Sequence, residues 1–273
     1  MPNQDPIAQF EKERSARIEG YKGKDSWNGS SAQWMDHAFR EHYMYNFAWA
    51  GRPIIQLPAD IVGFQELVYK TRPDVIFETG IAHGGSLMLS ASLLAMLDVC
   101  DALAEGRAFD PAKSHRKVIG IDIDIRQHNR DAIEAHPLSA YVDMVEGSST
   151  ETDTAERAKA LIPSGSKVLV ALDSNHTEDH VIKELELYSP LTSKGSYCIV
   201  YDTIVEDLAE DMFPNRPWAP GNNPKTALRK FMTRLDGGGV KAADGDTLAF
   251  ELDREMDGKL LLSVCPEGIL ARK

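Results

Sequence analysis

From Asp74 onward, short runs of apolar and β-branched residues alternate with segments of helical periodicity. This alternation is the sequence form of repeated strand–helix–strand units, which build a mainly parallel sheet covered by helices. It therefore predicts an α/β fold with a doubly wound, Rossmann-like sheet. The predicted strands are 75–78, 118–122, 141–145, 168–172 and 197–201, and the predicted helices are 86–103, 127–135, 152–161, 179–188 and 225–235.

Two more strands are predicted near the C-terminus, at 247–252 and 260–264, with only residues 253–259 between them. The Asp257-Gly258 pair in this short connection is a turn signal, and strands joined by a tight turn are antiparallel. We therefore expect a C-terminal antiparallel hairpin. A mainly parallel sheet closed by such a hairpin resembles the architecture of class I methyltransferases.

Residues 1–58 show no strand alternation, and we expect them to form a helical extension of a main domain at 59–273. A helix is predicted to begin at Pro58, with Asp60 as its candidate N-cap. Aromatic side chains in the extension are suited to pack it onto the main domain or onto a second copy of the chain, or to cover a substrate. A homo-oligomer is therefore expected. These aromatic residues are Trp27, Trp34, Phe39, Tyr43, Tyr45, Phe47 and Trp49.

The 273 residues carry a formal net charge of −12 at pH 7, so the surface repels phosphate backbones and nucleic acid is not an expected partner. No apolar run approaches the roughly 20 residues of a membrane span, and the N-terminus lacks the pattern of a secretory signal. We expect a cytoplasmic protein without a transmembrane segment. In that compartment Cys100, Cys198 and Cys265 should be buried, reduced thiols.

The loop after the first predicted strand is rich in glycine and reads E-T-G-I-A-H-G-G-S from Glu78 to Ser86. Gly80 allows a sharp turn, and Gly84 and Gly85 allow the backbone to approach a ligand at the start of the next helix. The spacing differs from the dinucleotide-binding G-x-G-x-x-G fingerprint and resembles the E-x-G-x-x-x-G motif of S-adenosylmethionine enzymes. This resemblance implies that Glu78 faces the amino group of the cofactor. The cofactor-binding residues expected in this loop are Glu78, Gly80, His83, Gly84 and Ser86.

Polar side chains also follow the next two predicted strands. Asp122 ends the second strand, where a carboxylate accepts hydrogen bonds from both ribose hydroxyls of a nucleotide. Ser148 and Ser149 follow the third strand, where they either contact an adenine ring or cap the helix that starts near Thr152. Because parallel strands end at the same edge of a sheet, we expect Glu78, Asp122 and Asp173, which ends the fourth strand, to line one continuous crevice and bind the cofactor there.

The fourth and fifth predicted strands end in groups suited to chemistry on a hydroxyl. Asp173 ends the fourth strand, His176 follows three residues later, and Asp202 follows the fifth strand. We predict that Asp173 and Asp202 bind Mg²⁺, which prefers carboxylate oxygens. Methyl transfer from a sulfonium is an in-line displacement, so the enzyme mainly aligns the acceptor oxygen and removes its proton. We therefore predict that His176 is the general base, with a hydrogen-bonded structural role as the alternative.

Five segments together resemble the cephalosporin hydroxylase family, whose members include O-methyltransferases for cephamycin, macrolide and rhamnosyl hydroxyls. The resemblance extends from about Tyr43 to the C-terminus. It implies an S-adenosylmethionine-dependent O-methyltransferase whose acceptor is a small, sugar-containing molecule with a free hydroxyl, such as a glycolipid, a polysaccharide or a natural product. The segments are 80–86, 120–124, 173–176, 195–203 and 217–227.

The chain departs from this family at the expected metal site. In related metal-dependent members, three acidic ligands come from the end of the fourth strand and from a Glu-Asp pair at the fifth. This chain has Tyr201-Asp202 in place of that pair, so one ligand is missing and the metal requirement is open. Either water, Thr203 or Glu206 completes the ligand shell, or the site works with His176 alone.

A proline-rich turn at residues 218–225 leads into the last predicted helix and resembles the substrate-side loop of the family. The resemblance implies that Trp218 and Asn222 contact the acceptor, together with Tyr201. Such a loop is compatible with a lid over the acceptor.

Other functions use fewer of these residues. With a distant histidine, His176 and Glu178 have the composition of an oxygenase iron site, and His176, Asp179 and His180 faintly match an inverted zinc-protease motif. Neither of these two metal sites uses the glycine-rich loop or Asp122. A nicotinamide oxidoreductase lacks its fingerprint. A catalytically inactive S-adenosylmethionine-binding protein is the non-enzyme alternative.

Overall fold

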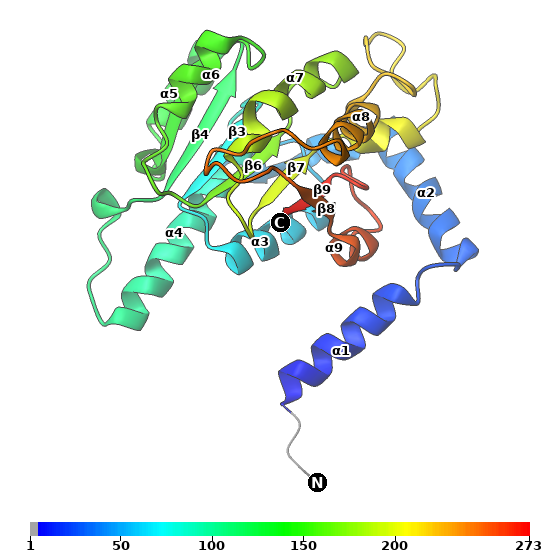
Figure 1. The fold of residues 1–273 in the computed structure, drawn as a ribbon, viewed down its shortest axis with the longest axis horizontal. Coiled ribbons are helices and arrows are strands. Elements are labelled where there is room, and N and C mark those ends of the chain that lie inside the picture. The colour runs from blue at the N-terminus through cyan, green and yellow to red at the C-terminus, as the bar shows by residue number, and fades with distance from the viewer. Residues whose placement is uncertain (1–4) are drawn as a thin grey trace.

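The structure, a computed structural model, describes residues 5–273, so the first four residues of the predicted extension lie outside it. A seven-stranded sheet forms its centre, in the order β5-β4-β3-β6-β7-β9-β8 (Figure 1). Strands β3 to β7 are parallel, and β9 and β8 are antiparallel at one edge. This arrangement confirms the predicted doubly wound α/β fold. The strands are β3 (Val75–Thr79), β4 (Lys117–Asp122), β5 (Val142–Glu146), β6 (Val168–Leu172), β7 (Tyr197–Val200), β8 (Phe250–Leu252) and β9 (Ile269–Arg272).

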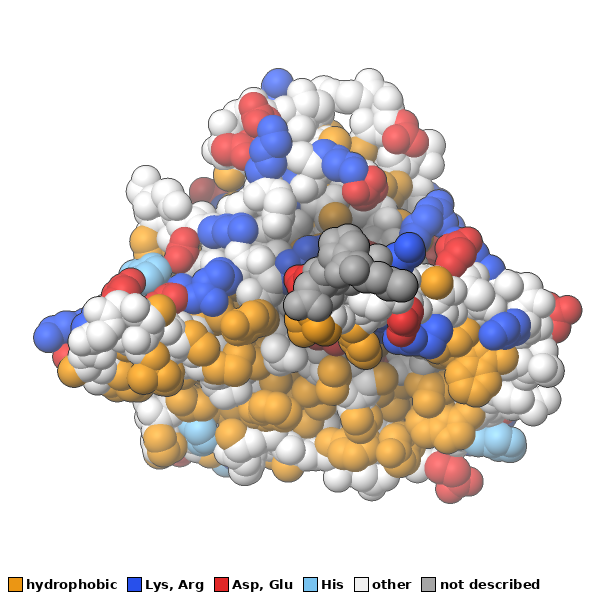
Figure 2. Space-filling model, turned by 90° about the horizontal axis from the view of Figure 1, so that it is seen from below, with side chains coloured by type: hydrophobic (Ala, Val, Ile, Leu, Met, Phe, Trp, Pro, Cys, Tyr) orange, Lys and Arg blue, Asp and Glu red, His pale blue; other side chains and the backbone are white. Residues whose placement is uncertain are grey.

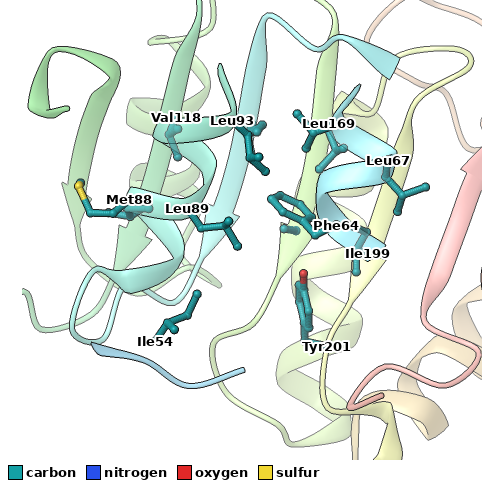
Figure 3. Packing of buried hydrophobic residues seen from close by; sticks show 14 of the residues in the cluster. Ile54, Phe64, Leu67, Met88, Leu89, Leu93, Val118, Leu169, Ile199 and Tyr201 are labelled. Atoms are coloured by element: carbon teal, nitrogen blue, oxygen red, sulfur yellow. The ribbon is translucent and has the colours of Figure 1, made fainter. Parts of the chain in front are cut away.

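Helices cover both faces of the sheet because side chains alternate along each strand. Ile76 of β3 packs in a core with α3 and α4, whereas Phe77 packs in the opposite core with α6, α7 and α8. Figure 3 shows Phe64 of α3 and Leu89 of α4 in the first of these cores. The three cysteines are free thiols, and Cys100 alone among them is only half-buried. The helices are α1 (Pro6–Glu19), α2 (Asp25–Arg40), α3 (Pro58–Thr71), α4 (Gly85–Glu105), α5 (Gln127–Glu134), α6 (Thr152–Lys159), α7 (Glu178–Tyr188), α8 (Pro224–Asp236) and α9 (Arg254–Lys259), and the short 3₁₀ helices are η1 (Tyr43–Asn46), η2 (Pro111–Lys113), η3 (Ser139–Tyr141), η4 (Ser189–Leu191) and η5 (Thr203–Asp207).

The C-terminal antiparallel pair forms from different residues than the sequence pattern predicts. The strand predicted at 260–264 is wrong, because this segment is irregular and its place beside β8 is taken by β9. Asp60, predicted as an N-cap, lies inside α3, where its carboxylate accepts a hydrogen bond from the Val264 amide at 2.9 Å. The expected turn at Asp257-Gly258 is part of α9. The Asp253 side chain caps this helix by accepting a hydrogen bond from the Met256 amide at 3.0 Å, so a local cap replaces the expected turn.

The predicted extension contains a hairpin as well as helices. Helices α1 and α2 form an arm that projects from the body (Figure 1), and β1 (Phe47–Trp49) pairs with β2 (Arg52–Ile54) against the start of α4. Trp27 and Trp34 on the arm stay 48% and 38% exposed. Figure 2 shows hydrophobic side chains gathered on the face seen from below. The homo-oligomer and the domain boundary at residue 58 stay predictions.

Helix α4 corrects the expectation about membrane spans. By length and composition it is apolar enough to cross a membrane, and it is the one helix of that kind within residues 5–273. Its Leu87, Leu94 and Leu97 are fully buried in the core, and its Asp98 forms a buried ion pair with Arg116. The core of a folded domain therefore accounts for the apolar composition of α4.

Candidate functional site

The strand order reverses between β3 and β6, and ligands of doubly wound sheets bind beyond the strand ends at such a point. The Asp173 amide donates to the Thr79 carbonyl at 3.0 Å, so the chain leaving β6 passes directly beside the loop after β3. Gly80 in this loop has φ +90°, and a Cβ there would overlap the Asp173 carbonyl group, 2.7 Å from its carbon atom. Glycine is therefore required at position 80 by this crossing.

The next glycines of the loop allow close packing against neighbouring segments. A Cβ on Gly85 would lie 2.7 Å from the Ile54 Cα in β2, and one on Gly84 would lie 2.7 Å from a side-chain carbon of α5. Arg52 of β2 donates from Nε to the His83 carbonyl at 2.9 Å. The extension thus holds the glycine-rich loop in place, which the sequence analysis did not predict.

A cavity of about 490 Å³ opens at this edge of the sheet. Its walls come from the loops after β3, β6 and β7, from residues 39–56 of the extension, and from residues 205–218. This cavity therefore brings together strand ends that are far apart in the sequence. The predicted site residues that line it are Gly80, His83, Ser86, Asp173, His176, Asp202 and Trp218.

Glu78 lies in a second, much smaller pocket of about 10 Å³, which has room for about one water molecule. Gly80, Ser86 and Asp173 line both pockets, so the two adjoin. The Glu78 carboxylate accepts a hydrogen bond from Ser90. Burial raises the pKa of Glu78 to about 7. The small pocket thus presents two acidic groups and is lined by no cationic side chain of the described residues.

Gln56 also lines both pockets, and no sequence pattern singled it out. It lies between β2 and α3, is 4% exposed, and its Oε1 has no hydrogen-bond partner among residues 5–273. A buried polar atom without a partner is costly to stability. Gln56 is therefore a candidate contact for a ligand at the boundary of the two pockets.

Tyr201, predicted to contact the acceptor, does not line the larger cavity. It is 5% exposed and belongs to the small pocket, where Figure 3 shows its hydroxyl directed toward Phe64. Burial raises the pKa of Tyr201 well above its ordinary value, so the hydroxyl stays neutral. The structure thus places Tyr201 in the wall of the small pocket, packed against the apolar core.

Asp173, His176 and Asp202 all line the larger cavity, with ligand atoms within 4.8 Å of one another. Asp202 Oδ2 lies 3.1 Å from His176 Nδ1, which fixes the imidazole and leaves Nε2 available. Trp218 packs edge-on against the same imidazole, with ring centroids 4.7 Å apart. Asp202 has φ +54°, a sparsely populated conformation that clusters at functional sites.

This cluster lacks positive charge. Burial, and then the charge of Asp202, raise the pKa of Asp173 well above its ordinary value. Within residues 5–273, Asp173 forms no ion pair, and Asp202 forms one, with His176. His176 carries a charge only when its imidazole is protonated. A bound cation would therefore relieve the repulsion between Asp173 and Asp202.

The two side chains considered as additional metal ligands are engaged elsewhere. Thr203 is fully buried and donates to the Pro266 carbonyl at 2.7 Å. Glu206 accepts a hydrogen bond from the Gly221 amide at 2.8 Å, in the loop before α8. The structure instead brings His176 into the position of a third candidate ligand.

Asp122 lies behind the larger cavity and is not one of its lining residues. Its Oδ2 accepts hydrogen bonds from the backbone amides of Ile81 and Ala82, at 2.8 and 3.0 Å. Both of these residues line the cavity. Asp122 thus holds the glycine-rich loop, which is an additional role beside the predicted contact with a ribose.

Ser148, Ser149, Gly84 and Asn222 are also absent from the residues that line the two pockets. Ser149 makes a 3.0 Å hydrogen bond with His180 Nε2, and Ser148 makes one of 2.9 Å with a neighbouring threonine. Asn222 accepts a hydrogen bond from the first amide of α7 at 3.0 Å. Their predicted contacts with adenine, cofactor and acceptor stay predictions.

The wall of the larger cavity also contains residues that the sequence analysis did not select as site residues. The aromatic cluster of the extension was the available signal, because Phe39 and Tyr45 belong to it and line the cavity. Irregular segments gave no such signal. The unpredicted lining residues with aromatic or polar side chains are Phe39, His42, Tyr45, Gln56, Ser174, Phe213, Asn215 and Arg216.

Comparison with known proteins adds a family match. The family model described as Rhamnosyl O-methyltransferase/CmcI matches residues 41–273. A rhamnosyl O-methyltransferase of Mycobacterium tuberculosis is 27% identical over 168 residues, which cover 61% of this chain and 57% of that protein. One of Mycobacterium leprae is 25% identical over 170 residues, covering 60% and 66%. The chain thus matches somewhat more than half the length of these curated relatives.

Solved structures with a similar arrangement were also found. A CmcI structure with Mg and SAM has a TM-score of 0.49 and 18% identity, covering 84% of this chain and 77% of that chain. CalS11, described as a TDP-rhamnose 3'-O-methyltransferase, has a TM-score of 0.45 and 18% identity, covering 80% and 90%.

Proposed function

The chain belongs to the Rhamnosyl O-methyltransferase/CmcI family, and we propose that it is an S-adenosylmethionine-dependent O-methyltransferase that methylates a hydroxyl of a small, sugar-containing acceptor. The observation that carries the proposal is the cavity at the strand reversal, where a crowded glycine loop adjoins a histidine–carboxylate cluster. Such a site provides a place for a nucleoside-containing donor beside a base for the acceptor.

The cofactor's amino-acid end fits the small acidic pocket. Glu78 is buried and Asp173 is half-buried there, neither with a cationic partner among the described residues, and the α-ammonium group of S-adenosylmethionine would supply one. The unpaired Oε1 of Gln56 is a further acceptor for that ammonium group. Asp122, at the end of β4, is assigned to the ribose hydroxyls. S-adenosylmethionine held by these residues would supply its methyl group to an acceptor in the larger cavity.

His176 is assigned as the general base. Asp202 Oδ2 lies 3.1 Å from Nδ1 of His176 and favours the proton on that nitrogen, so Nε2 carries the lone pair that removes the proton of the acceptor hydroxyl. Bound S-adenosylmethionine would supply the methyl group to the deprotonated acceptor oxygen by an in-line displacement. The resulting imidazolium is stabilised by the Asp202 carboxylate, and Trp218 keeps the ring in place.

The carboxylates of Asp173 and Asp202 suit Mg²⁺, because their like charges are close together and lack a permanent cationic partner among the described residues. Mg²⁺ bound there would lower the pKa of the acceptor hydroxyl. The cluster holds one histidine and two carboxylates, which does not match the two-histidine iron site of an oxygenase.

Transfer of a labelled methyl group from S-adenosylmethionine to rhamnosides tests the proposed function. We expect Asp122→Ala to weaken cofactor binding, and Asp202→Ala to lower turnover while cofactor binding is unchanged. A chelator should lower turnover of the wild-type chain, and added Mg²⁺ should restore it. Cofactor binding without transfer to any hydroxyl would favour the inactive binding protein. Full activity both in Asp202→Ala and in the presence of chelator would refute the metal assignment.

Cofactor affinity should depend on pH through Glu78. The pKa of about 7 means that the carboxyl is mostly neutral at pH 6 and mostly ionised at pH 8, and the ionised form alone attracts the ammonium group. We expect affinity for S-adenosylhomocysteine to rise about ten-fold between these values. Calorimetric titration at pH 6, 7 and 8 measures this. Glu78→Gln should abolish the rise, and the exposed control Glu251→Gln should retain it.

A further inference from the structure

Ala82 in the glycine-rich loop has a strained backbone. Its φ of +46° lies in the left-handed region, which is unfavourable for any residue that carries a Cβ. Such residues persist only where surrounding contacts hold them, and they cluster at ligand sites. Ala82 lines the larger cavity together with its neighbours Ile81 and His83. The contacts that hold Ala82 therefore determine the shape of this part of the cavity wall.

Asn129 of α5 binds the carbonyl group of Ala82. Its Nδ2 donates to the Ala82 carbonyl at 3.0 Å, and the Ala82 amide donates to Asp122 Oδ2 at 3.0 Å. Both backbone polar groups of Ala82 are thus bound by side chains of other elements. Asn129 is 3% exposed, so the surrounding core fixes the position of its side-chain amide.

Arg52 of β2 connects Asn129 to the next residue of the loop. Its Nε donates to the His83 carbonyl at 2.9 Å, and its Nη2 donates to Asn129 Oδ1 at 2.7 Å. The guanidinium is planar and rigid, so it sets the separation of its two acceptors, which a lysine ammonium cannot do. The extension, α5 and the glycine-rich loop are therefore joined in one hydrogen-bond network.

This network influences the cavity through the loop alone. Neither Arg52 nor Asn129 is among the residues of the described chain that line the two pockets. Within residues 5–273, no hydrogen bond joins either of them to Asp173, His176 or Asp202. A change in Arg52 or Asn129 should therefore alter the wall formed by the glycine-rich loop and leave the proposed base in place.

We propose, building on the proposed function, that Arg52 and Asn129 are positioning residues for the cofactor. Together they hold Ala82 in its left-handed conformation and keep the glycine-rich loop in the shape that binds S-adenosylmethionine. A loop that is held in this shape in advance does not have to be ordered when the cofactor binds. Cofactor affinity thus depends on an arginine of the extension that lines neither pocket.

Calorimetric titration with S-adenosylhomocysteine tests the role of Arg52. Arg52→Gln should raise Kd by about 10- to 100-fold, because two bonds from a charged donor are lost. Arg52→Lys retains the charge but cannot make both bonds, so its Kd should also rise, by about 10-fold. In both variants kcat at saturating S-adenosylmethionine should stay within about two-fold of wild type, because the network does not contact the base. The exposed control Arg107→Gln should bind as wild type does.

Asn129→Asp separates the shape of the loop from the stability of the fold. The new carboxylate would form an ion pair with Arg52, but it could not donate to the Ala82 carbonyl and would repel that oxygen. Kd for S-adenosylhomocysteine should therefore rise about 10-fold while the melting temperature stays the same or rises. In the matched control Asn28→Ala, the lost amide also donates to a backbone carbonyl, that of Tyr21 in the arm, and Kd should not change.

Hydrogen exchange of the Ile81 and Ala82 amides tests the network without cofactor. Both amides donate to Asp122, and they should exchange about 10-fold faster or more in Arg52→Gln and Asn129→Asp, because the loop opens more often. Unchanged exchange in both variants would overturn the proposal, and so would a wild-type Kd in Arg52→Gln. A loss of kcat at saturating cofactor as large as the rise in Kd would also overturn it.

The same measurements distinguish this proposal from the proposed function. If exchange and Kd change as expected and no hydroxyl is methylated, the proposed methyl transfer fails and the positioning role stands. If methyl transfer occurs and Arg52→Gln binds S-adenosylhomocysteine like wild type, the positioning role fails and the proposed function stands. Failure of the wild-type chain to bind S-adenosylhomocysteine would sink both.

Discussion

Replacing His176 by alanine should lower kcat by about 10²- to 10⁴-fold while the affinity for S-adenosylmethionine stays unchanged, because the variant loses the general base and no assigned cofactor contact. The geometry supports this split. The imidazole lines the acceptor cavity and is fixed by Asp202 at 3.1 Å, whereas the small acidic pocket is lined by other residues. Initial rates of label transfer and calorimetric titration of the cofactor measure the two quantities.

Two further variants show whether the loss is specific to the base. Asp202→Asn should also lower kcat, because it removes the charge that orients the imidazole and stabilises the imidazolium. His115→Ala removes an exposed histidine that pairs with Asp74. Both residues precede the first residues of β3 and β4, at the edge of the sheet opposite the cavity, so the variant should leave kcat unchanged. Wild-type turnover in His176→Ala would show that another group removes the proton.

Replacing Gly80 by alanine should abolish cofactor binding and lower the free energy of unfolding by about 3 kcal/mol or more. The new Cβ would overlap the Asp173 carbonyl, and both the glycine loop and the chain after β6 would have to move. That movement displaces Asp173 from the boundary of the two pockets. Denaturant unfolding and cofactor titration test the two effects.

Gly195→Ala is the matched control for Gly80→Ala. Both glycines have positive φ, +90° at Gly80 and +71° at Gly195, so both substitutions strain the backbone. A Cβ on Gly195 meets no atom within 4 Å, so its cost should be limited to about 1 kcal/mol of backbone strain. Equal loss of unfolding free energy in the two variants would mean that the close contact with the Asp173 carbonyl adds nothing to the cost of Gly80→Ala.

The local hydrophobic pattern of the sequence was sufficient to predict the parallel strands of the central sheet and the helices between them. The apolar run at 168–172 is β6 with the same bounds, and α7 begins one residue before its predicted start. Strands that are covered on both faces need continuous apolar runs, and such runs are visible in the sequence. The pattern failed at 260–264, where Asp60 from α3 binds the Val264 amide and no local signal reveals that contact.

The candidate site was predictable where strand ends position the side chains. Asp173, His176 and Asp202 were selected because parallel strands end at one edge of the sheet, and their ligand atoms lie within 4.8 Å of one another. Gln56 lies in an irregular segment without periodicity, and Arg52 lies in the short strand β2, which was not predicted. Their significance depends on which groups surround them and which of their atoms have partners.

The sequence by itself determined the order of strands and helices from β3 to α8, and with it the edge of the sheet at which a ligand site forms, because hydrophobic periodicity and turn residues act within a few positions along the chain. The tertiary structure alone decided that Gly80 faces the Asp173 carbonyl, that the extension holds the glycine loop through Arg52, and that Asn129 binds the Ala82 carbonyl. These contacts join segments far apart in the chain, and close packing between such segments leaves no periodic trace in the sequence.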